Sequence, residues 1–139
     1  IATYLTPPWW NSMTVAARVS GTHTDGDVPY FEAAFIGGGR TVRGLPMGRY
    51  EGNQAVFANL DLRLRVSRVT FVLPWDFGVL GVADVGRVSV DGEQSDTWHP
   101  SVGGGLWAAL LDRSLAASLN VATGAGQGIF INAGGGFTF

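Results

Sequence analysis

The chain has 139 residues, which is the size of a single domain. Only 14% of its residues are charged, against roughly 25% in an ordinary soluble domain, whereas 46% are hydrophobic and 21 are glycine. The net charge of −2 disfavours a nucleic-acid partner, which would require a basic surface. The chain has no cysteine, which excludes disulfides, a thiolate nucleophile and cysteine-ligated zinc. No apolar run approaches the ~20 residues of a spanning helix, so a helical membrane protein is excluded.

The chain begins with Ile1, and no basic-then-apolar leader precedes its first polar residues. We therefore expect a mature product or a piece of a longer protein, forming one domain over 1–139.

Hydrophobic residues recur with a period of two rather than 3.6, which predicts strands and almost no helix. In chain order, the predicted strands are 2–6 (the weakest), 13–20, 53–67, 77–88, 102–111, 114–122 and 129–139. The clearest is 53–67, where leucines at 60, 62 and 64 alternate with Asp61, Arg63 and Arg65. Successive side chains of a strand point to opposite sides, so this strand has one apolar and one polar face.

One-sided strands suit two architectures, and the connections between them decide which we expect. A soluble sandwich or lipocalin-like barrel buries the apolar face, whereas an outer-membrane barrel turns it towards lipid. One end of the sheet collects loops of about 6, 13 and 32 residues and the other turns of about 2, 9 and 6, an asymmetry typical of outer-membrane barrels. Aromatic residues near the strand ends on the short-turn side suit an interfacial girdle, although core packing would also explain them. These residues are Trp9, Trp10, Trp75, Phe137 and Phe139. We therefore predict an all-β fold, an antiparallel transmembrane β-barrel with six to eight strands in this chain.

The longest connection, 21–52, contains the glycine-rich segment Gly37-Gly38-Gly39-Arg40-Thr41-Val42-Arg43-Gly44-Leu45. A phosphate-binding loop is not indicated, because no lysine follows and no helical pattern begins there. The segment reads as a tight turn that projects Arg43 from a loop long enough to fold back into a barrel.

Four segments together resemble the bacterial surface antigen family, the BamA/TamA superfamily of outer-membrane barrels. They are 37–45, Asn59-Leu60-Asp61-Leu62-Arg63, Val82-Ala83-Asp84-Val85-Gly86 and Gly134-Gly135-Gly136-Phe137-Thr138-Phe139. The resemblance covers roughly 13–139. It implies the last six strands of a barrel that usually has sixteen, with 21–52 as the sixth extracellular loop, folding into the lumen.

The resemblance also assigns residues to a contact between this loop and the barrel wall. The matching positions are Val42, Arg43, Gly44, Asp61, Asp84 and Gly86. Leu45 and Val82 depart from the family's motifs. In the family, the loop arginine pairs with the two acids inside the lumen. Strand parity agrees, because it places Asp61 on the polar face of its strand, and a planar guanidinium can bridge two carboxylates.

The C-terminal segment resembles the β-signal, a targeting strand that assembly machinery recognises. Gly134, Phe137 and Phe139 match it, whereas Ala133 departs at its polar position. Terminal aromatic residues on the lipid face would also be favoured by packing alone.

We find no catalytic constellation and predict no enzyme, no cofactor and no metal site. The two histidines, His23 and His99, lie in predicted loops, and no Gly-x-Ser-x-Gly elbow accompanies them. Together with Asp25, Asp27 and Asp96 they could bind a metal, but solvated loop polarity explains them better.

The resemblance implies insertion or translocation of polypeptides at the bacterial outer membrane. The partners would be outer-membrane lipid, client polypeptides and periplasmic assembly factors. An incompletely paired seam at 129–139, rich in glycine, would template an incoming strand. Six strands cannot close a membrane barrel, for which eight is the minimum, so a longer parent or a second copy would supply the rest.

Three alternatives remain open at this point. The barrel could be a passive anchor for an enzymatic or periplasmic domain. It could be a self-contained eight-stranded structural or pore-forming barrel, in which 21–52 would supply two short strands. The chain could also be a soluble β-sandwich. The sequence identifies neither the clients nor any domain preceding Ile1.

Overall fold

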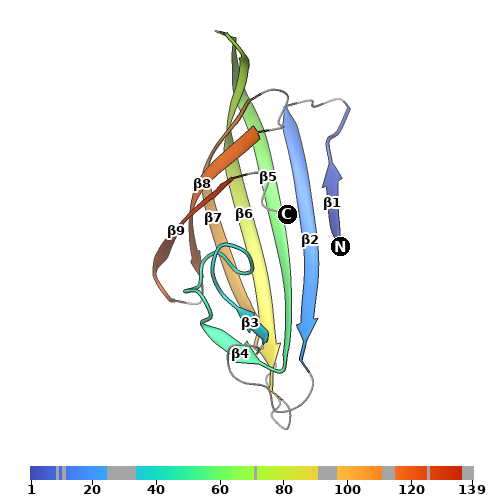
Figure 1. Ribbon diagram of the computed structural model, residues 1–139, viewed down its shortest axis with the longest axis vertical. Coiled ribbons are helices and arrows are strands. Elements are labelled where there is room, and N and C mark those ends of the chain that lie inside the picture. Colours follow the sequence, from blue (N-terminus) through green and yellow to red (C-terminus); the bar gives the residue numbers. More distant parts are fainter. Residues whose placement is uncertain are drawn as a thin grey trace.

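The computed structural model describes residues 1–8, 10, 12–24, 34–70, 72–90, 97–110, 115–124 and 126–135 (Figure 1). Within these ranges the chain is all-β: they contain nine strands and no helix. Accordingly, no helix long and apolar enough to cross a bilayer occurs among them. The prediction of an all-β, antiparallel fold is confirmed.

Seven strands form one sheet in the order β1-β2-β5-β6-β7-β8-β9, and each is antiparallel to its neighbours. Their bounds are Ala2–Leu5 (β1), Met13–His23 (β2), Gln54–Thr70 (β5), Pro74–Ser89 (β6), His99–Leu110 (β7), Leu115–Gly124 (β8) and Ile129–Gly135 (β9). Two short strands, Ala34–Ile36 (β3) and Tyr50–Gly52 (β4), pair with each other in a second sheet. We call the end of the sheet at which His23, Gln54 and Ser89 are paired the loop end, and the opposite end, at which Thr70 pairs with Pro74, the turn end.

Each predicted strand is present, but one predicted turn is wrong. Residues 68–76 are not a nine-residue connection, because β5 continues through Thr70 and β6 begins at Pro74, with these two residues paired. Arg68 and Asp76, the two ends of the predicted connection, face each other across the two strands.

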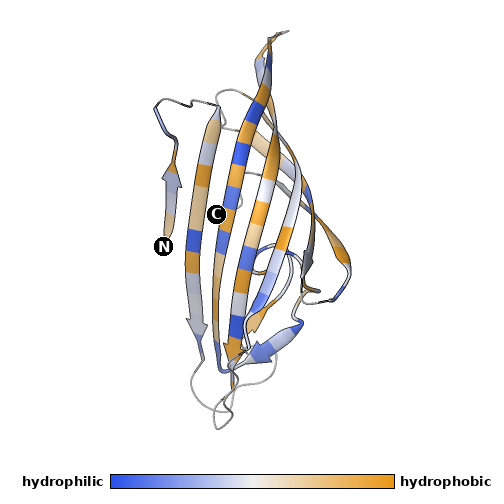
Figure 2. Ribbon diagram, turned by 180° about the vertical axis from the view of Figure 1, so that it is seen from behind, coloured by the Kyte–Doolittle hydropathy of each residue, from blue (hydrophilic) through white to orange (hydrophobic). Residues whose placement is uncertain are grey.

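Along the middle of β5, polar side chains are buried and apolar side chains are exposed. Its polar residues Asn59, Asp61 and Arg63 are at most 6% exposed, whereas Leu60 and Leu62 are 46% and 39% exposed. The alternation of hydrophilic and hydrophobic positions is visible along the strands in Figure 2. We call the buried side of the sheet its inner face and the other its outer face. Further exposed apolar residues at outer positions are Val19, Val79, Val102, Leu106, Leu119, Val121, Ile129 and Ile131.

A bulge in β5 keeps arginines on the inner face along the whole strand. The register with β6 shifts between Arg65 and Ser67, so that one extra residue is accommodated there. A single extra residue reverses the parity of everything beyond it, since side chains alternate between faces. Arg68 therefore lies on the same face as Asp76, the residue of β6 with which it is paired.

The segment that contains β3 and β4 lies against the inner face of the sheet near the loop end (Figure 1). Its buried residues Ile36, Val42 and Leu45 form an apolar cluster with Phe57 of β5 and Val88 of β6. A second inner cluster, nearer the turn end, includes Leu80, Val82 and Trp107. The inner face is thus a mixed surface, with apolar clusters on either side of buried charged groups.

Within the described residues the main sheet is open: β1 and β9 are its edges, and each pairs with only one neighbouring strand. Although 21–52 does supply two short strands, β3 and β4 form a sheet of their own and do not extend the main sheet.

Candidate functional site

The glycine-rich part of the loop forms a compact turn that presents Arg43 to the sheet. Gly37 and Gly38 have φ of 120° and 93°, a region that L side chains rarely adopt, so glycine is required there. The turn is closed by a hydrogen bond of 3.0 Å from Gly38 N to Leu45 O. A second bond, from Gly37 N to Thr41 Oγ1 at 2.8 Å, supports the bend.

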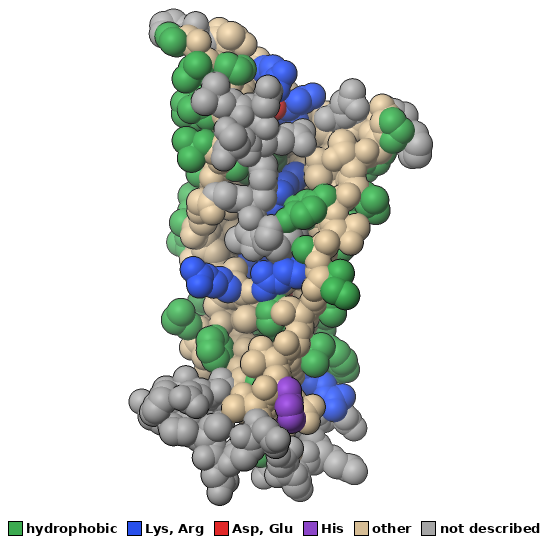
Figure 3. Space-filling model, turned by 45° about the vertical axis from the view of Figure 1, so that its right-hand side comes forward, with side chains coloured by type: hydrophobic (Ala, Val, Ile, Leu, Met, Phe, Trp, Pro, Cys, Tyr) green, Lys and Arg blue, Asp and Glu red, His purple; other side chains and the backbone are tan. Residues whose placement is uncertain are grey.

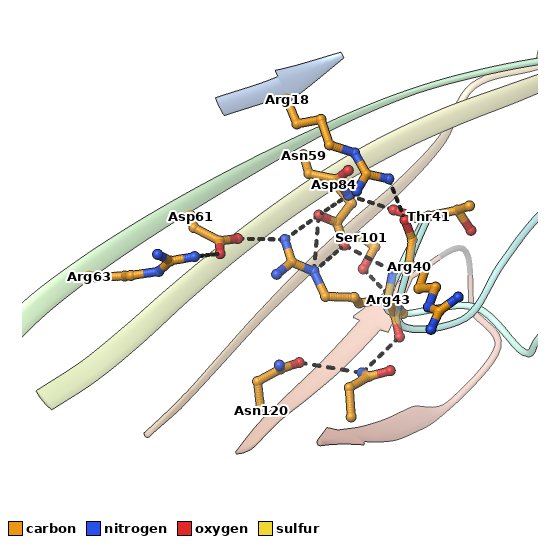
Figure 4. Close-up of polar contacts among 12 residues, drawn as sticks. Arg18, Arg40, Thr41, Arg43, Asn59, Asp61, Arg63, Asp84, Ser101 and Asn120 are labelled. Carbon is orange, nitrogen blue, oxygen red and sulfur yellow. Dashed lines mark hydrogen bonds and ion pairs between the residues drawn. The ribbon is translucent and has the colours of Figure 1, made fainter. Parts of the chain in front are cut away.

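Arg43 is 2% exposed and binds two aspartates on adjacent strands (Figure 4). Its Nε donates to Asp84 Oδ2 at 2.9 Å, and its Nη2 donates to Asp84 Oδ1 at 2.5 Å. The main-chain N–H of Arg43 donates to Asp84 Oδ2 at 2.9 Å. Nη2 also forms an ion pair with Asp61 Oδ1 at 2.8 Å. The forked guanidinium thus bridges β5, which carries Asp61, and β6, which carries Asp84.

Charges in this buried site are balanced. Arg63 pairs with Asp61 Oδ2 at 2.9 Å, so that two arginines face two aspartates. Burial alone would lower the pKa of Arg43, but the hydrogen bond and the charge of Asp84, together with Asp61, raise this pKa above its ordinary value. The guanidinium therefore stays charged at neutral pH.

Three further polar side chains, from β5, β7 and β9, hold the backbone of the same turn. Asn59 of β5 donates to Thr41 O at 2.5 Å and to Asp84 Oδ1 at 2.8 Å. Ser101 of β7 accepts from Gly44 N at 2.8 Å, and Asn132 of β9 donates to Arg43 O at 3.2 Å. Polar groups on four strands, β5, β6, β7 and β9, thus converge on Thr41–Gly44.

Two glycines of the site are required by close approach. A Cβ on Gly44 would lie 2.5 Å from the carbonyl carbon of Thr123, closer than real Cβ contacts. A Cβ on Gly86 would lie 2.7 Å from Cγ2 of Val42. These two positions allow the turn to reach the wall of β6 and β8. Leu45, which departs from the family's motif, is 1% exposed and belongs to the apolar cluster beneath the turn.

A polar cavity of about 780 Å³ lies between the loop and the C-terminal strands. Arg18 and Arg40 line one side, and Ser118, Asn120 and Asn132 line the other. Arg18 of β2 donates to Arg40 O at 2.6 Å, which ties β2 to the loop as well. Figure 3 shows arginine side chains gathered in the hollow, with hydrophobic side chains along the flanks.

A second ion cluster, which the sequence did not predict, occupies the inner face at the turn end. Asp76 accepts from Arg68 Nε at 2.6 Å and pairs with Arg65 Nη1 at 3.4 Å. The bulge after Arg65 makes this cluster possible, and no sequence pattern marked the bulge. Asp76 and Asp84 are an even number of residues apart on β6, so they share a face, and this was the one signal available in the sequence.

The structure thus brings together all six predicted residues of the loop contact. Asn59, Ser101 and Asn132 were not predicted from the sequence. Asn59 could have been found, because it is two residues from Asp61 on the same strand and therefore shares its face. Of the predicted β-signal, Gly134 lies on β9, whereas Phe137 and Phe139 lie outside the described residues. Trp10 and Trp75 are 58% and 40% exposed. Trp9 lies outside the described residues.

The two histidines lie at strand ends rather than in the predicted loops, since His23 ends β2 and His99 begins β7. His99 stacks on Tyr50 with ring centroids 3.8 Å apart, and His23 is exposed. Asp25, Asp27 and Asp96 lie outside the described residues, within which no group of three histidines or acids could hold a metal ion.

Comparison with known proteins gives no relative. No protein-family model matches the chain, and neither the curated proteins nor the solved structures contain a significant match.

Proposed function

We propose that the chain is the C-terminal part of an outer-membrane β-barrel of the BamA/TamA type, which inserts or translocates polypeptides at the bacterial outer membrane. The observation that carries the proposal is that the inner face of the sheet buries charged groups while its outer face is exposed and apolar. Buried charged groups on the inner face and exposed leucines on the outer face suit a wall between lipid and a polar lumen. In a soluble sheet the same leucines would face the core.

The dimensions of the outer face support this placement. Along β6, outer positions from Phe77 to Val85 are apolar or glycine, and the chain reaches a charged residue only at Arg87. This length matches the roughly 9–11 residues that a tilted strand needs to cross a bilayer. At the turn end, Trp75 stacks on Phe77 with ring centroids 6.0 Å apart, and both are exposed. Aromatic residues in this position are typical of an interfacial girdle.

The loop would act as an internal lock. Ordering a long loop costs conformational entropy, and the contacts of Arg43 with Asp61 and Asp84 offset this cost inside the barrel. Hydrogen bonds to Ser101 and Asn132 extend the lock from β5 and β6 to β7 and β9. The lumen would therefore be filled at the loop end, and the wall around it held in one shape.

Strand β9 would provide the seam. It is an edge of the sheet, and seven pairs, from Thr123↔Ile129 to Ala117↔Gly135, join it to β8. Unpaired backbone groups at such an edge are costly in lipid and can template an incoming strand. Missing strands, from a longer parent or a second copy, would complete the barrel between β9 and β1.

The insertion activity is tested with the protein reconstituted in liposomes and a urea-unfolded outer-membrane protein as client. The client should fold faster than in empty liposomes. The variants Phe130→Pro and Ile131→Pro each remove one main-chain N–H, and these two N–H groups point to opposite edges of β9. The substitution that removes the N–H pointing away from β8 should slow folding of the client. The substitution that removes the N–H pointing towards β8 should mainly weaken the pairing of β9 with β8. A barrel that inserts but leaves client folding at the rate of empty liposomes would be a passive anchor.

A further inference from the structure

We propose that the long loop controls the seam. While its compact turn, residues 37–45, lies on the inner face, it holds β9 against β8 through Asn132, and release of the turn lets β9 separate. Asn132 is thus a positioning residue of the seam. The inference rests on the proposed function, since it takes β9 as the strand that meets a client. It goes further by assigning the contact that keeps this strand in place.

Strand β9 is held less firmly than the strands in the middle of the sheet. It has seven residues, whereas β5 and β6 have 17 and 16. Within the described residues it pairs with β8 alone. Its outer side chains Ile129 and Ile131 are both 75% exposed, so they bury little apolar area against the protein. Contacts on the inner face of β9 are therefore a large part of what keeps it paired.

Asn132 supplies the inner contact between β9 and the turn. Its Nδ2 donates to the carbonyl oxygen of Arg43 at 3.2 Å and to Oδ1 of Asn120 at 3.3 Å (Figure 4). Asn120 is the residue of β8 that pairs with Asn132, and it is 3% exposed. One amide group thus links the turn, β8 and β9. Separation of β9 takes this donor away from both acceptors, which raises the free energy of the open seam.

Two further contacts bring the loop against the β8–β9 hairpin. A Cβ on Gly39 would lie 3.2 Å from Oδ1 of Asn132, so the backbone of the turn approaches this side chain closely. Beyond the turn, Nε of Arg49 donates to Oε1 of Gln127 at 3.1 Å, in the connection between β8 and β9. The loop therefore meets the hairpin both along β9 and at its connection.

The turn is anchored elsewhere, by the buried ion pairs of Arg43 with Asp61 and Asp84. These aspartates lie on β5 and β6, which are four and three places from β9 in the sheet order. A contact that exists only when the turn is seated and β9 is paired stabilises both arrangements by the same amount. Release of the turn therefore eases the opening of β9, and opening of β9 eases release of the turn, by one common factor. For one hydrogen bond this factor is about two to ten.

Hydrogen–deuterium exchange of the full protein in lipid vesicles, without any client, tests the coupling. Asn132→Ala should raise the exchange rate of amides in 129–135 by about two- to tenfold. It should also raise exchange in the turn 37–45, because the coupling is reciprocal. Arg43→Ala, which removes the anchor of the turn, should raise exchange in 129–135 as well. Added to Asn132→Ala, it should raise this exchange no further, since its effect on β9 passes through Asn132.

The chain offers two controls. Ser118→Ala removes a hydroxyl of β8 that has no hydrogen-bond partner among the described residues, and it should leave exchange in β9 unchanged. Strand β1, at the opposite edge, pairs with β2 and reports general loosening of the sheet, so its exchange should not follow that of β9. If Arg43→Ala does not fold, Asn59→Ala takes its place, because it removes a hydrogen bond from β5 to the carbonyl oxygen of Thr41 in the same turn.

Unchanged exchange in 129–135 after Asn132→Ala would overturn the inference. An additive effect of Arg43→Ala in the Asn132→Ala protein would overturn it too, because the two residues would then stabilise the sheet independently. A rise in the exchange of β1 equal to that of β9 would indicate general loosening and would have the same consequence.

Failure of this inference is distinguishable from failure of the proposed function, because exchange is measured without a client. A protein that accelerates client folding, but whose β9 exchanges independently of Asn132, contradicts control of the seam by the loop alone. A protein whose β9 responds to Asn132→Ala, but which leaves client folding at the rate of empty liposomes, contradicts the proposed function alone.

Discussion

The main-chain N–H of Arg43 and the Nε of its side chain both donate to Oδ2 of Asp84, each at 2.9 Å. One carboxylate thus fixes the position of the loop backbone and the direction of the arginine side chain. Asp84 lies on β6, in the middle of the sheet, and is 4% exposed. The loop is therefore held at a point from which water is excluded, where removing one member of the pair is costly.

Arg43→Ala should destabilise the protein by about 3–5 kcal/mol, because it leaves buried carboxylates without their partner. Arg43→Lys should recover only part of this loss, since an ammonium group cannot make the forked contact. Urea unfolding in detergent micelles provides the measurement. The control is Arg49→Ala, whose exposed side chain bonds to Gln127 and should matter by less than about 1 kcal/mol. Equal effects at Arg43 and Arg49 would contradict the lock.

The two aspartates should not be equivalent. Asp84 accepts from the side chain and backbone of Arg43 and from Asn59, whereas Asp61 shares its charge between Arg43 and Arg63. In double-mutant cycles with Arg43→Ala, we expect a coupling of about 2–3 kcal/mol for Asp84→Asn and a smaller one for Asp61→Asn. A larger coupling for Asp61 would mean that the ion pair, not the forked contact, holds the loop.

Two glycines on β6 offer a matched comparison. Gly86→Ala places a methyl group 2.7 Å from Val42 and should cost about 1–3 kcal/mol by overpacking. Gly81→Ala faces outward, where the nearest heavy atom is 3.9 Å away, and should be neutral or slightly stabilising. Thermal unfolding of both variants distinguishes them. Tolerance of alanine at Gly86 would show that the turn does not press against this wall.

Leu62→Arg places a charge in the middle of the outer face. If that face contacts lipid, the substitution should cost about 2–4 kcal/mol near the bilayer midplane. Gln54→Arg on the same strand and face, but at the polar loop end, should cost about 0–1 kcal/mol. Folding into lipid vesicles under increasing urea measures both. A Leu62→Arg protein that folds as stably as Gln54→Arg would contradict lipid contact at this position.

Much of the fold could be predicted because alternation is a local property. The period of two in 53–67 defines both faces of β5 without knowledge of any partner strand, and the same holds for β8 and β9. The ends of strands were less predictable, because β5 and β6 extend into the predicted connection 68–76, where Arg68 pairs with Asp76. Their pairing depends on a bulge, which exists only in the relation between two strands.

The residues of the candidate site also differ in how far the sequence could predict them. Arg43, Asp61 and Asp84 could be chosen from motifs and parity, because a loop arginine needs acids on the inner face. Ser101 and Asn132 could not, because their roles depend on the path of the loop across β7 and β9. A serine and an asparagine in glycine-rich strands carry no signal until the register is known.

The central claim is that lipid contacts the outer face and water the inner one. Nitroxide labels at Leu62→Cys and Leu119→Cys, both outer, and at Ser118→Cys, which lines the polar cavity, test it in lipid vesicles. We predict that oxygen relaxes the outer labels more than a water-soluble nickel complex does, and that the order reverses at 118. Labels at 62 and 119 that respond to the nickel complex, or to neither reagent, would contradict the claim.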